Sequence, residues 1–421
     1  MRITLRAADL QAAVKATKGI INRYSKMPIL LCILIEEQNG RVTFRATDTE
    51  TTVTHAANMA ALGKQPLDKS GAIAVPAKEL ASAIKGLPKA AAVTLESDSE
   101  FILSIDTDTG ASFKLQGLDP ANFPSAPAFI EDGGAFLPQT TLKSMIQSIL
   151  FAIPRRNPRK VLLGGLVELD GTSLKMVATD GRRLGFSEAQ PDAVRGNTDT
   201  RAIIPSKALA EIVKSCKKKD EVEILFSKRD PQEDSPFEKN ARLVSICLWP
   251  TTYIVRSTEG EYPNYKMVIP QTFAHKAIMN RQAALEITNR ATAMADPRHN
   301  AVTLNLTASE IAFSSMTYDV GSFRDSIPAI FEDGNDDTAH EICFNSNFLA
   351  EVLKTATSKT VSLEFNTPSH PVVVRPIDPS GDSSTLFVIM PIKLEPVQQI
   401  GDEDEEPESS AIRETEVVCV A

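Results

Sequence analysis

The chain has 421 residues, of which 42% are apolar and 24% charged, with 20 glycines and 26 prolines. This composition excludes collagen-like, low-complexity and wholly disordered proteins, and at roughly 150 residues per domain the length predicts about three domains. No run of about 18 apolar residues occurs, and the first residues lack the apolar stretch of a signal peptide. We therefore expect a cytoplasmic protein with no membrane segment.

The net charge of −9 is distributed unevenly along the chain. Residues 395–421 hold nine acidic side chains against the single base Arg413, a net charge of −8, so residues 1–394 together carry −1. A nearly neutral body can still present a basic surface when its acidic residues lie elsewhere. The acidic tail has too few apolar residues to offset its chain entropy, and we expect 395–421 to be disordered.

A threefold repeat organises residues 1–394. In chain order, each repeat opens with a helix, indicated by apolar residues at helical spacing within 10–17, 142–149 and 284–294. Strand patterns follow at 42–48, 174–180 and 311–317. A second helix then begins near Leu80, Leu209 and Leu349 and leads into a half-buried strand at 93–97, 222–227 and 361–366. The sequence predicts an α+β fold of three similar domains, each with two helices packed on antiparallel sheets.

Breaks rich in proline, glycine or acidic residues separate the repeats at 123–127, 131–134 and 259–264. We expect domains over 1–125, 133–260 and 268–394, followed by the acidic tail. Residues 228–241 have no counterpart in the other two repeats, and we expect them to form a surface loop.

Basic residues recur on the second helix of each repeat, on the face opposite the apolar residues. This basic stripe has no interleaved aromatic residues and no side chains spaced to read base edges. It predicts contact with nucleic-acid phosphates without sequence preference, and an ordinary solvated surface is the alternative. The stripe consists of Lys78, Lys85 and Lys89, then Lys207, Lys214 and Lys218, then Lys354.

Patterns for catalysis, metal binding and phosphate-binding loops are missing from the sequence, and we expect neither an enzyme nor a cofactor. The five cysteines form no CxxC pair and mostly lie in apolar runs, so we expect reduced core residues. Asp48 and Asp180 end predicted strands, where aspartate is more typical of a turn than of catalysis. A hydrolase using either aspartate stays as one alternative function, and a peptide-binding scaffold that never binds DNA as another.

Several separated motifs resemble the bacterial replication sliding clamp, the β subunit of DNA polymerase III. They lie at 27–30, 46–48, 178–184, 260–265, 268–270 and 388–394, so the resemblance spans the body of the chain in order. It implies a DNA-clamp fold that assembles as a homodimeric ring of six similar domains around duplex DNA. It further implies a processivity factor in DNA replication, which tethers the replicative polymerase, the clamp loader and other clamp-binding-motif proteins through a hydrophobic pocket between the second and third domains.

Helix dimensions agree with a dimer. Six helices about 10 Å across, laid around a hole, leave a bore of about 9 Å, whereas twelve leave about 28 Å. A DNA duplex about 20 Å wide passes only through the larger bore.

The resemblance also implies which residues form each site. The peptide pocket would comprise Leu162, Thr179, Gly181, Arg182, Arg183, Leu184, Pro263, Met267, Val268, His299, Val388, Met390, Pro391 and Ile392, with Arg159, Asn345 and Phe348 near its second part. DNA would meet Arg23, Tyr24, Arg155, Arg156, Lys160 and Lys207 besides Lys78, Lys85, Lys214 and Lys354. The dimer contact would join an edge strand bearing Phe113 and Leu115 to the third domain near Met294.

The acidic tail leaves the body beside this pocket. We hypothesise that residues 402–406 screen nearby basic surface, or that residues 417–420 compete for the pocket. A plain solubilising tail is the alternative.

Overall fold

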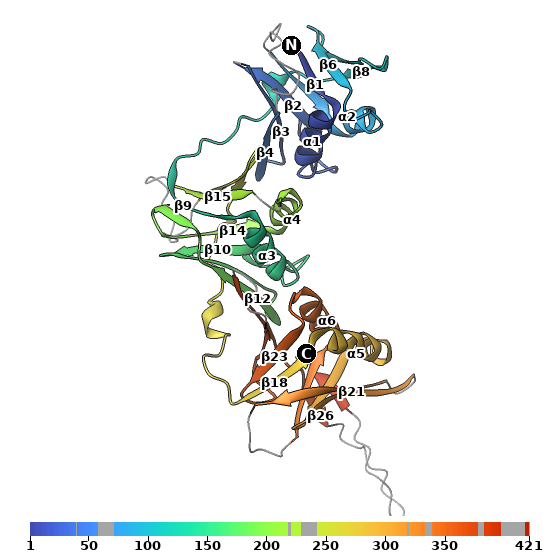
Figure 1. Cartoon of the computed structure of the whole chain (residues 1–421), viewed down its shortest axis with the longest axis vertical. Helices are drawn as coiled ribbons and strands as arrows, with labels where there is room; N and C mark the ends of the chain where they lie inside the picture. Colours follow the sequence, from blue (N-terminus) through green and yellow to red (C-terminus); the bar gives the residue numbers. More distant parts are fainter. Residues whose placement is uncertain are drawn as a thin grey trace, which may run out of the picture. The chain divides into compact units, whose positions relative to one another are not determined.

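The computed structural model describes residues 1–38, 40–57, 71–217, 220–228, 242–317, 320–332, 339–377, 383–396 and 417–420. The chain forms two compact units, drawn in Figure 1. Unit 1 comprises residues 1–146, 156–176 and 188–262, and unit 2 comprises 147–155, 177–187 and the chain from 263 onward. Among the described residues, no helix is both long and apolar enough to cross a membrane.

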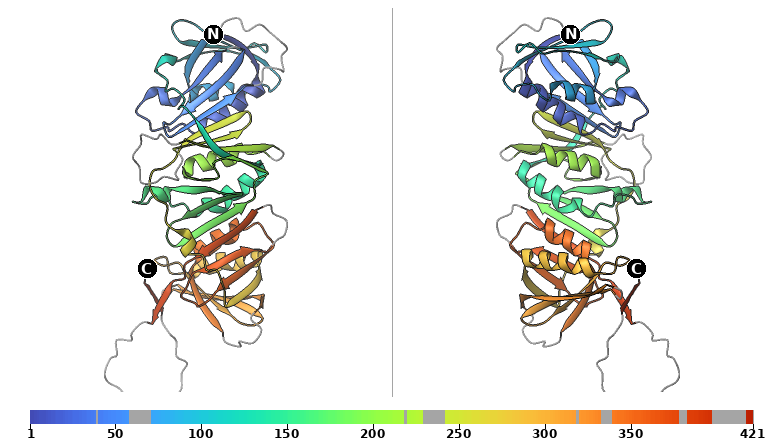
Figure 2. Two further views of the ribbon diagram at one scale, coloured as in Figure 1. Left: turned by 90° about the vertical axis from the view of Figure 1, so that its left-hand side faces the viewer. Right: turned by 90° about the vertical axis from the view of Figure 1, so that its right-hand side faces the viewer.

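The helices lie where the apolar spacing predicts them, and their apolar stripes are buried against the sheets. Leu10, Leu142 and Ala284, at the predicted core positions of the first helix in each repeat, are fully buried. In unit 2 the helices α5 and α6 lie side by side (Figure 2). The described residues hold α1 (Ala7–Lys18), α2 (Ala77–Ile84), α3 (Gln139–Leu150), α4 (Ser206–Ser215), α5 (Arg281–Met294) and α6 (Ser346–Thr355).

Unit 1 contains two complete antiparallel sheets and part of a third. The first has the order β1 (Arg2–Arg6), β6 (Ala92–Ser97), β7 (Ile102–Thr107) and β8 (Ser112–Gln116). The second runs β13 (Ala193–Gly196), β9 (Glu131–Pro138), β15 (Glu221–Ser227), β16 (Leu243–Leu248), β17 (Thr251–Arg256), β4 (Thr51–Ala56), β3 (Arg41–Thr47), β2 (Cys32–Gln38) and β5 (Gly71–Pro76). Strands β14 (Asp199–Pro205), β10 (Gly164–Asp170) and β11 (Ser173–Thr179) follow one another in a further sheet.

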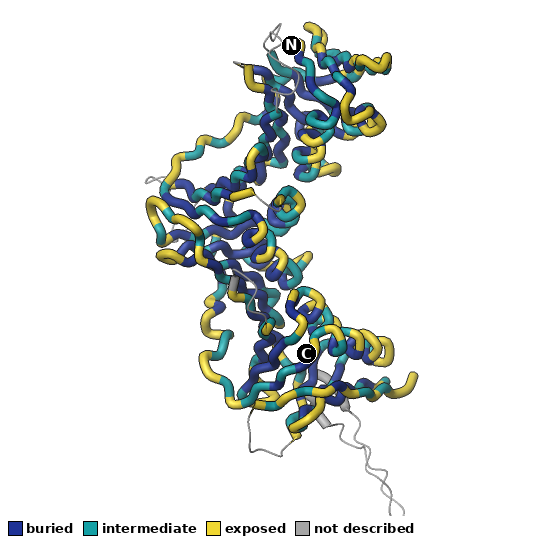
Figure 3. The backbone as a smooth tube through the Cα atoms, in the orientation of Figure 1, coloured by how far each residue is buried: buried dark blue, intermediate teal, exposed yellow. Residues whose placement is uncertain are grey.

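Unit 2 is built on strands in which buried and exposed residues alternate. Figure 3 shows the buried chain concentrated in the strands, while helix surfaces and turns are exposed. The strand order is β12 (Arg183–Ala189), β25 (Ser383–Ile389), β24 (Val372–Pro376), β23 (Thr360–Phe365), β18 (His275–Asn280), β21 (Gly321–Phe331), β20 (Glu310–Thr317), β19 (Ala301–Leu306) and β22 (His340–Asn345).

The threefold repeat is confirmed, and it shows how successive repeats join. In unit 1, β4 of the first repeat pairs with β17 of the second, with His55 opposite Thr251. In unit 2, β12 of the second repeat lies beside β25 of the third. Strands β4, β12 and β21 hold the same position in the three repeats, and β8, β17 and β25 hold another. The pair that remains is therefore β21 and β8. Strand β8 has β7 as its neighbour, and no other strand of the described chain pairs with it.

Three expectations need correction. The repeats open with a strand, β1, β9 or β18, and the helix follows it. The segment 131–134, expected to be a break, is the start of β9. Its glycines allow close approach of backbone, because a Cβ on Gly133 would lie 2.1 Å from the Asn197 carbonyl oxygen. Lys89 lies beyond the end of α2, so helical phase does not place it on the basic stripe, and Lys218 is outside the described residues.

Outside the body, residues 229–241 of the expected loop and 397–416 of the tail lie beyond the described residues. Within the tail, the expectation of disorder is wrong for the strand β27 (Val417–Val420), which pairs antiparallel with β26 (Lys393–Pro396). The physical reason is composition, because a run of β-branched valines favours an extended strand within an otherwise acidic segment.

Candidate nucleic-acid interface and peptide site

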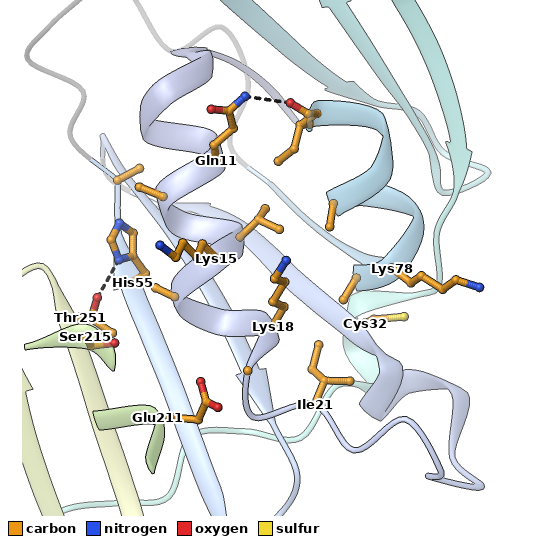
Figure 4. A pocket seen from close by; sticks show the side chains of 18 of the residues that line it. Gln11, Lys15, Lys18, Ile21, Cys32, His55, Lys78, Glu211, Ser215 and Thr251 are labelled. Atoms are coloured by element: carbon orange, nitrogen blue, oxygen red, sulfur yellow. Dashed lines mark hydrogen bonds between the residues drawn. The ribbon is translucent and has the colours of Figure 1, made fainter. Parts of the chain in front are cut away.

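An open hollow of about 2110 Å³ lies in unit 1, between α1, α2, α4 and the turn that joins β16 to β17 (Figure 4). Its lining is basic, which suits a polyanion. Seven cationic side chains line it, Lys15, Lys18, Arg23, Lys78, Lys85, Lys214 and Lys217, against the carboxylates of Asp9, Glu79 and Glu211.

The fold holds the first two helices of this hollow side by side. The Gln11 side chain on α1 donates hydrogen bonds to the carbonyl oxygens of Ile84, at 2.8 Å, and Leu87, at 3.1 Å, at the end of α2. Ile84 is the last residue of α2, so the Gln11 side chain caps this helix as it joins it to α1. Lys15, Lys18 and Lys78 are exposed opposite the buried stripes (Figure 4).

Two lysines of the predicted stripe already have anionic partners. Lys207 Nζ lies 2.7 Å from Asp48 Oδ2 and also donates to the Ile20 carbonyl oxygen, which joins α4 to the end of α1 within unit 1. Lys214 Nζ lies 2.6 Å from Glu211 Oε1. Lys207 is not among the residues that line the hollow.

The other residues predicted to contact DNA are exposed, and all of them except Arg23 lie outside the hollow. Tyr24 is 93% exposed and follows the exposed Arg23 in a loop of unit 1. Arg156 and Lys160 are exposed in unit 1, and the exposed Arg155 and Lys354 belong to unit 2. Sequence reasoning missed Lys217, which follows α4 and so carries no helical phase, and Trp249 in the turn after β16.

In unit 2, the turn between β11 and β12 is fixed by its own side chains. Thr179 Oγ1 donates to the Arg183 carbonyl oxygen at 2.7 Å, and Asp180 Oδ1 accepts from the backbone N–H groups of Arg182 and Arg183 at 2.9 and 3.0 Å. Gly181 has φ +90°, which favours glycine. Asp180 is therefore a turn residue, as its position at a strand end predicts.

The guanidinium group of Arg183 is the centre of a cluster of charged and aromatic side chains. Its Nε lies 3.0 Å from Asp180 Oδ2, and its Nη1 donates to Glu351 on α6. The Phe348 ring centre is 4.4 Å from Cζ, and the Phe151 ring centre is 5.4 Å from it. Sequence reasoning missed Phe151 and Glu351, because only the folded chain brings them to the turn.

Backbone hydrogen bonds place the end of β25 beside the same turn. The Met390 N–H donates to the Arg182 carbonyl oxygen at 2.8 Å. Met390 is 37% exposed. Met267 and Val268, in the segment between β17 and β18, are 83% and 38% exposed. Leu184 and Val388 are buried, so they can form only the floor of a surface site.

The remaining predicted pocket residues fall into two groups. In unit 2, Asn345 Oδ1 caps α6, and its Nδ2 donates to the His299 carbonyl oxygen at 3.1 Å. Pro263, Pro391 and Ile392 are partly exposed in the same unit. Leu162 and Arg159 belong to unit 1, and Leu162 is buried there.

The cysteines Cys32 and Cys216 line the hollow of unit 1. The pKa values of the thiols of Cys32 and Cys216 are raised by burial to about 11, so both are protonated near neutral pH. Within the described residues, no group of three or more histidine, cysteine or acidic side chains lies close enough together to hold a metal ion.

This fold is that of the bacterial sliding clamps. The structure of the sliding clamp from Pseudomonas aeruginosa bound to griselimycin superposes with a TM-score of 0.82 at 20% identity, covering 94% of this chain and 100% of that one. The clamp from Bartonella birtlesii gives a TM-score of 0.80 at 26% identity, covering 93% of this chain and 99% of that chain.

The chain belongs to the family of the DNA polymerase III beta subunit. It matches the N-terminal domain of that family over residues 1–127, the central domain over 136–264 and the C-terminal domain over 266–393. It is 25% identical over 399 residues to the beta sliding clamp of Synechococcus elongatus, covering 94% of this chain and all of that relative. It is 26% identical over 396 residues to the beta sliding clamp of Staphylococcus aureus, with 93% and 99% coverage.

Proposed function

We propose that the chain acts without enzymatic activity as a sliding clamp, a processivity factor that encircles duplex DNA and tethers the replicative polymerase. Family membership supports the role, and the observation that carries it is the basic hollow on α1, α2 and α4. Cations from helix surfaces meet phosphates without reading base edges, so the ring would hold DNA of any sequence.

The repeat supports a closed ring of two copies. Strand β4 pairs with β17 and β12 with β25, which leaves β8 and β21 as the counterparts that have not met in one chain. We infer that β8, with Phe113 and Leu115, pairs with β21 of a second copy, near Met294 at the end of α5. A pairing of this kind covers the exposed edge of β8. Two such pairings, one from each copy, close the ring. Sedimentation equilibrium should give about twice 45.7 kDa at micromolar concentration, and a persistent monomer would contradict the ring.

Retention on circular DNA tests the encirclement. Loaded by its clamp loader on nicked circular DNA, the protein should stay bound through a salt wash and leave when the circle is linearised. Equal retention on both forms would contradict a topological link and favour ordinary surface binding.

The hollow is tested by charge removal. Substituting Lys15, Lys18 and Lys85 by glutamine should reduce the slope of log affinity against log salt by as much as about 2.7 per chain of the ring, at about 0.9 per phosphate. A control variant with glutamine at Arg2, Arg195 and Lys276 loses the same charge outside the hollow and should keep the slope. Equal slopes in the two variants would remove the hollow from the DNA site.

We further propose a binding site for a short apolar peptide of partner proteins. It is formed by the turn 179–184, Met267, Val268 and the end of β25. Exposed methionines suit varied apolar ligands, because their side chains adapt to different shapes. Met390→Ala should weaken binding of such a peptide by about 1–3 kcal/mol. Met316→Ala, which truncates a methionine 55% exposed elsewhere in unit 2, is the matched control and should leave the affinity unchanged.

A further inference from the structure

The side chain of Arg183 has little surface left for a ligand. It is 12% exposed, although it lies in a turn at the surface of unit 2. The rings of Phe348 and Phe151 lie within 6 Å of its guanidinium carbon. A carboxylate that approaches this group must therefore bind at the edge of the guanidinium, where its N–H groups point.

Two carboxylates already occupy that edge, and they are held differently. Asp180 is in the same turn as Arg183, and its second oxygen is fixed by two backbone N–H groups at 2.9 and 3.0 Å. Glu351 reaches Arg183 from α6, and its side chain is 50% exposed. Water can solvate a released Glu351, whereas release of Asp180 would break the turn. Glu351 is thus the partner that a ligand carboxylate would displace.

The charges of the cluster also disfavour an acidic ligand. Arg183 carries one positive charge and its two partners carry two negative ones, so the cluster has an excess of negative charge at neutral pH. An acidic group brought to Arg183 meets this excess before it can compete for the guanidinium.

We propose that Glu351 sets the charge preference of the peptide site. Because Glu351 already forms an ion pair with Arg183, the site selects partner segments that are neutral where they contact this cluster. The inference rests on the proposed peptide site and adds the chemistry of the partner. Glu351 acts through Arg183 and is a positioning residue.

The test compares two capped peptides of leucine, serine and phenylalanine residues, identical except that one serine is aspartate in the second. Binding to the full-length wild-type protein and to Glu351→Gln is measured by titration calorimetry at low salt. Glutamine keeps the size of the side chain and removes its charge. We expect the affinity for the aspartate peptide, relative to the neutral one, to rise by up to about fivefold in the variant, as for a partly exposed ion pair.

Controls separate this effect from a general disturbance. Glu332→Gln removes the ion pair to Lys276, whose side chains are 36% and 46% exposed, and should leave the ratio of the two affinities unchanged. Glu351→Ala should shift the ratio in the same direction as Glu351→Gln. An equal change for both peptides, or no change, would overturn the role of Glu351 while the peptide site stands. Failure of both peptides to bind the wild-type protein would overturn the peptide site itself.

Discussion

Acidification should weaken unit 1 through His55, a buried side chain at the junction of the first two repeats. His55 on β4 is 8% exposed, and its Nδ1 lies 2.8 Å from Thr251 Oγ1 on β17. Burial, aided by the charge of Lys217 and partly opposed by Asp9, lowers the pKa of His55 to about 4. The native state therefore holds His55 neutral at pH 5, where an unfolded chain would protonate it.

The sign and size follow from proton linkage. The pKa of histidine in an unfolded chain is about 6.5, so between pH 6.5 and 4 the unfolded state binds more protons than the native one. The contribution of neutral His55 is complete above pH 6.5 and is lost as the pH falls toward 4. At 1.36 kcal/mol per pKa unit, lowering the pH from 7.5 to 5 should cost about 2 kcal/mol of unfolding free energy.

Urea unfolding of wild type and His55→Gln at both pH values measures this cost. Trp249 is the one tryptophan of the chain and lies 5.9 Å from the Arg41 guanidinium carbon, so its fluorescence reports the same junction. The carboxylates titrate in both proteins, and the difference between the two pH dependences isolates His55. We expect the wild type to lose about 2 kcal/mol more than the variant.

Comparing the two pH values within each protein removes any general destabilisation by the substitution. If both proteins lose the same free energy on acidification, the depressed pKa of His55 does not contribute to stability, and the reasoning is wrong.

Three further predictions concern single contacts. Lys207→Met should lower the unfolding free energy of unit 1 by about 1 kcal/mol, because it removes the ion pair to Asp48. The same variant should keep the salt dependence of DNA binding. A slope of log affinity against log salt reduced by about 0.9 per chain would show instead that this lysine contacts a phosphate. Leu115→Lys, placed on the edge strand β8, should convert the dimer to a folded monomer in sedimentation equilibrium, whereas an intact dimer would move the interface elsewhere. Deleting 397–421 removes β27, which pairs with β26 just after the proposed peptide site. The deletion should raise the affinity for the peptide if the strand hinders its entry. An unchanged affinity would indicate a tail that only aids solubility.

Sequence periodicity predicts most of this fold because each repeat buries one face of its helices and strands. Leu10, Leu142 and Ala284 stand at helical spacing and are all buried. Periodicity fails at the segment 131–134, because a pair of glycines is typical of a turn and also of a strand that another backbone approaches closely. The choice depends on Asn197, which is distant in sequence.

The candidate sites were less predictable, because charge on a helix face does not show which charges are already paired. Lys207 and Lys78 occupy equivalent offsets of the same pattern, yet Lys207 reaches Asp48 while Lys78 lines the hollow. Likewise, the motif around Arg183 predicts a site residue but not its partners. Glu351 follows it by 168 positions, and no local pattern links the two.

The repeat also offers a physical reason why the proposed peptide site is at one junction within the chain and not at its counterpart. Both junctions contain the same turn. Thr47 and Thr179 accept from the backbone N–H two residues later, at 3.1 and 3.0 Å. The next residue after each aspartate has positive φ, +77° at Thr49 and +90° at Gly181. The backbone scaffold is therefore shared, and side chains make the difference.

That difference lies where the paired strand leaves the turn. The Arg256 N–H donates to the Glu50 carbonyl oxygen at 2.8 Å in unit 1, and the Met390 N–H donates to the Arg182 carbonyl oxygen at 2.8 Å in unit 2. At the end of the paired strand the exposed residue is thus a charged Arg256 at one junction and an apolar Met390 at the other. An apolar peptide gains free energy only where it covers apolar surface. Glu50 and Arg256 are charged and exposed at the first junction, so the proposed peptide site is expected at the second.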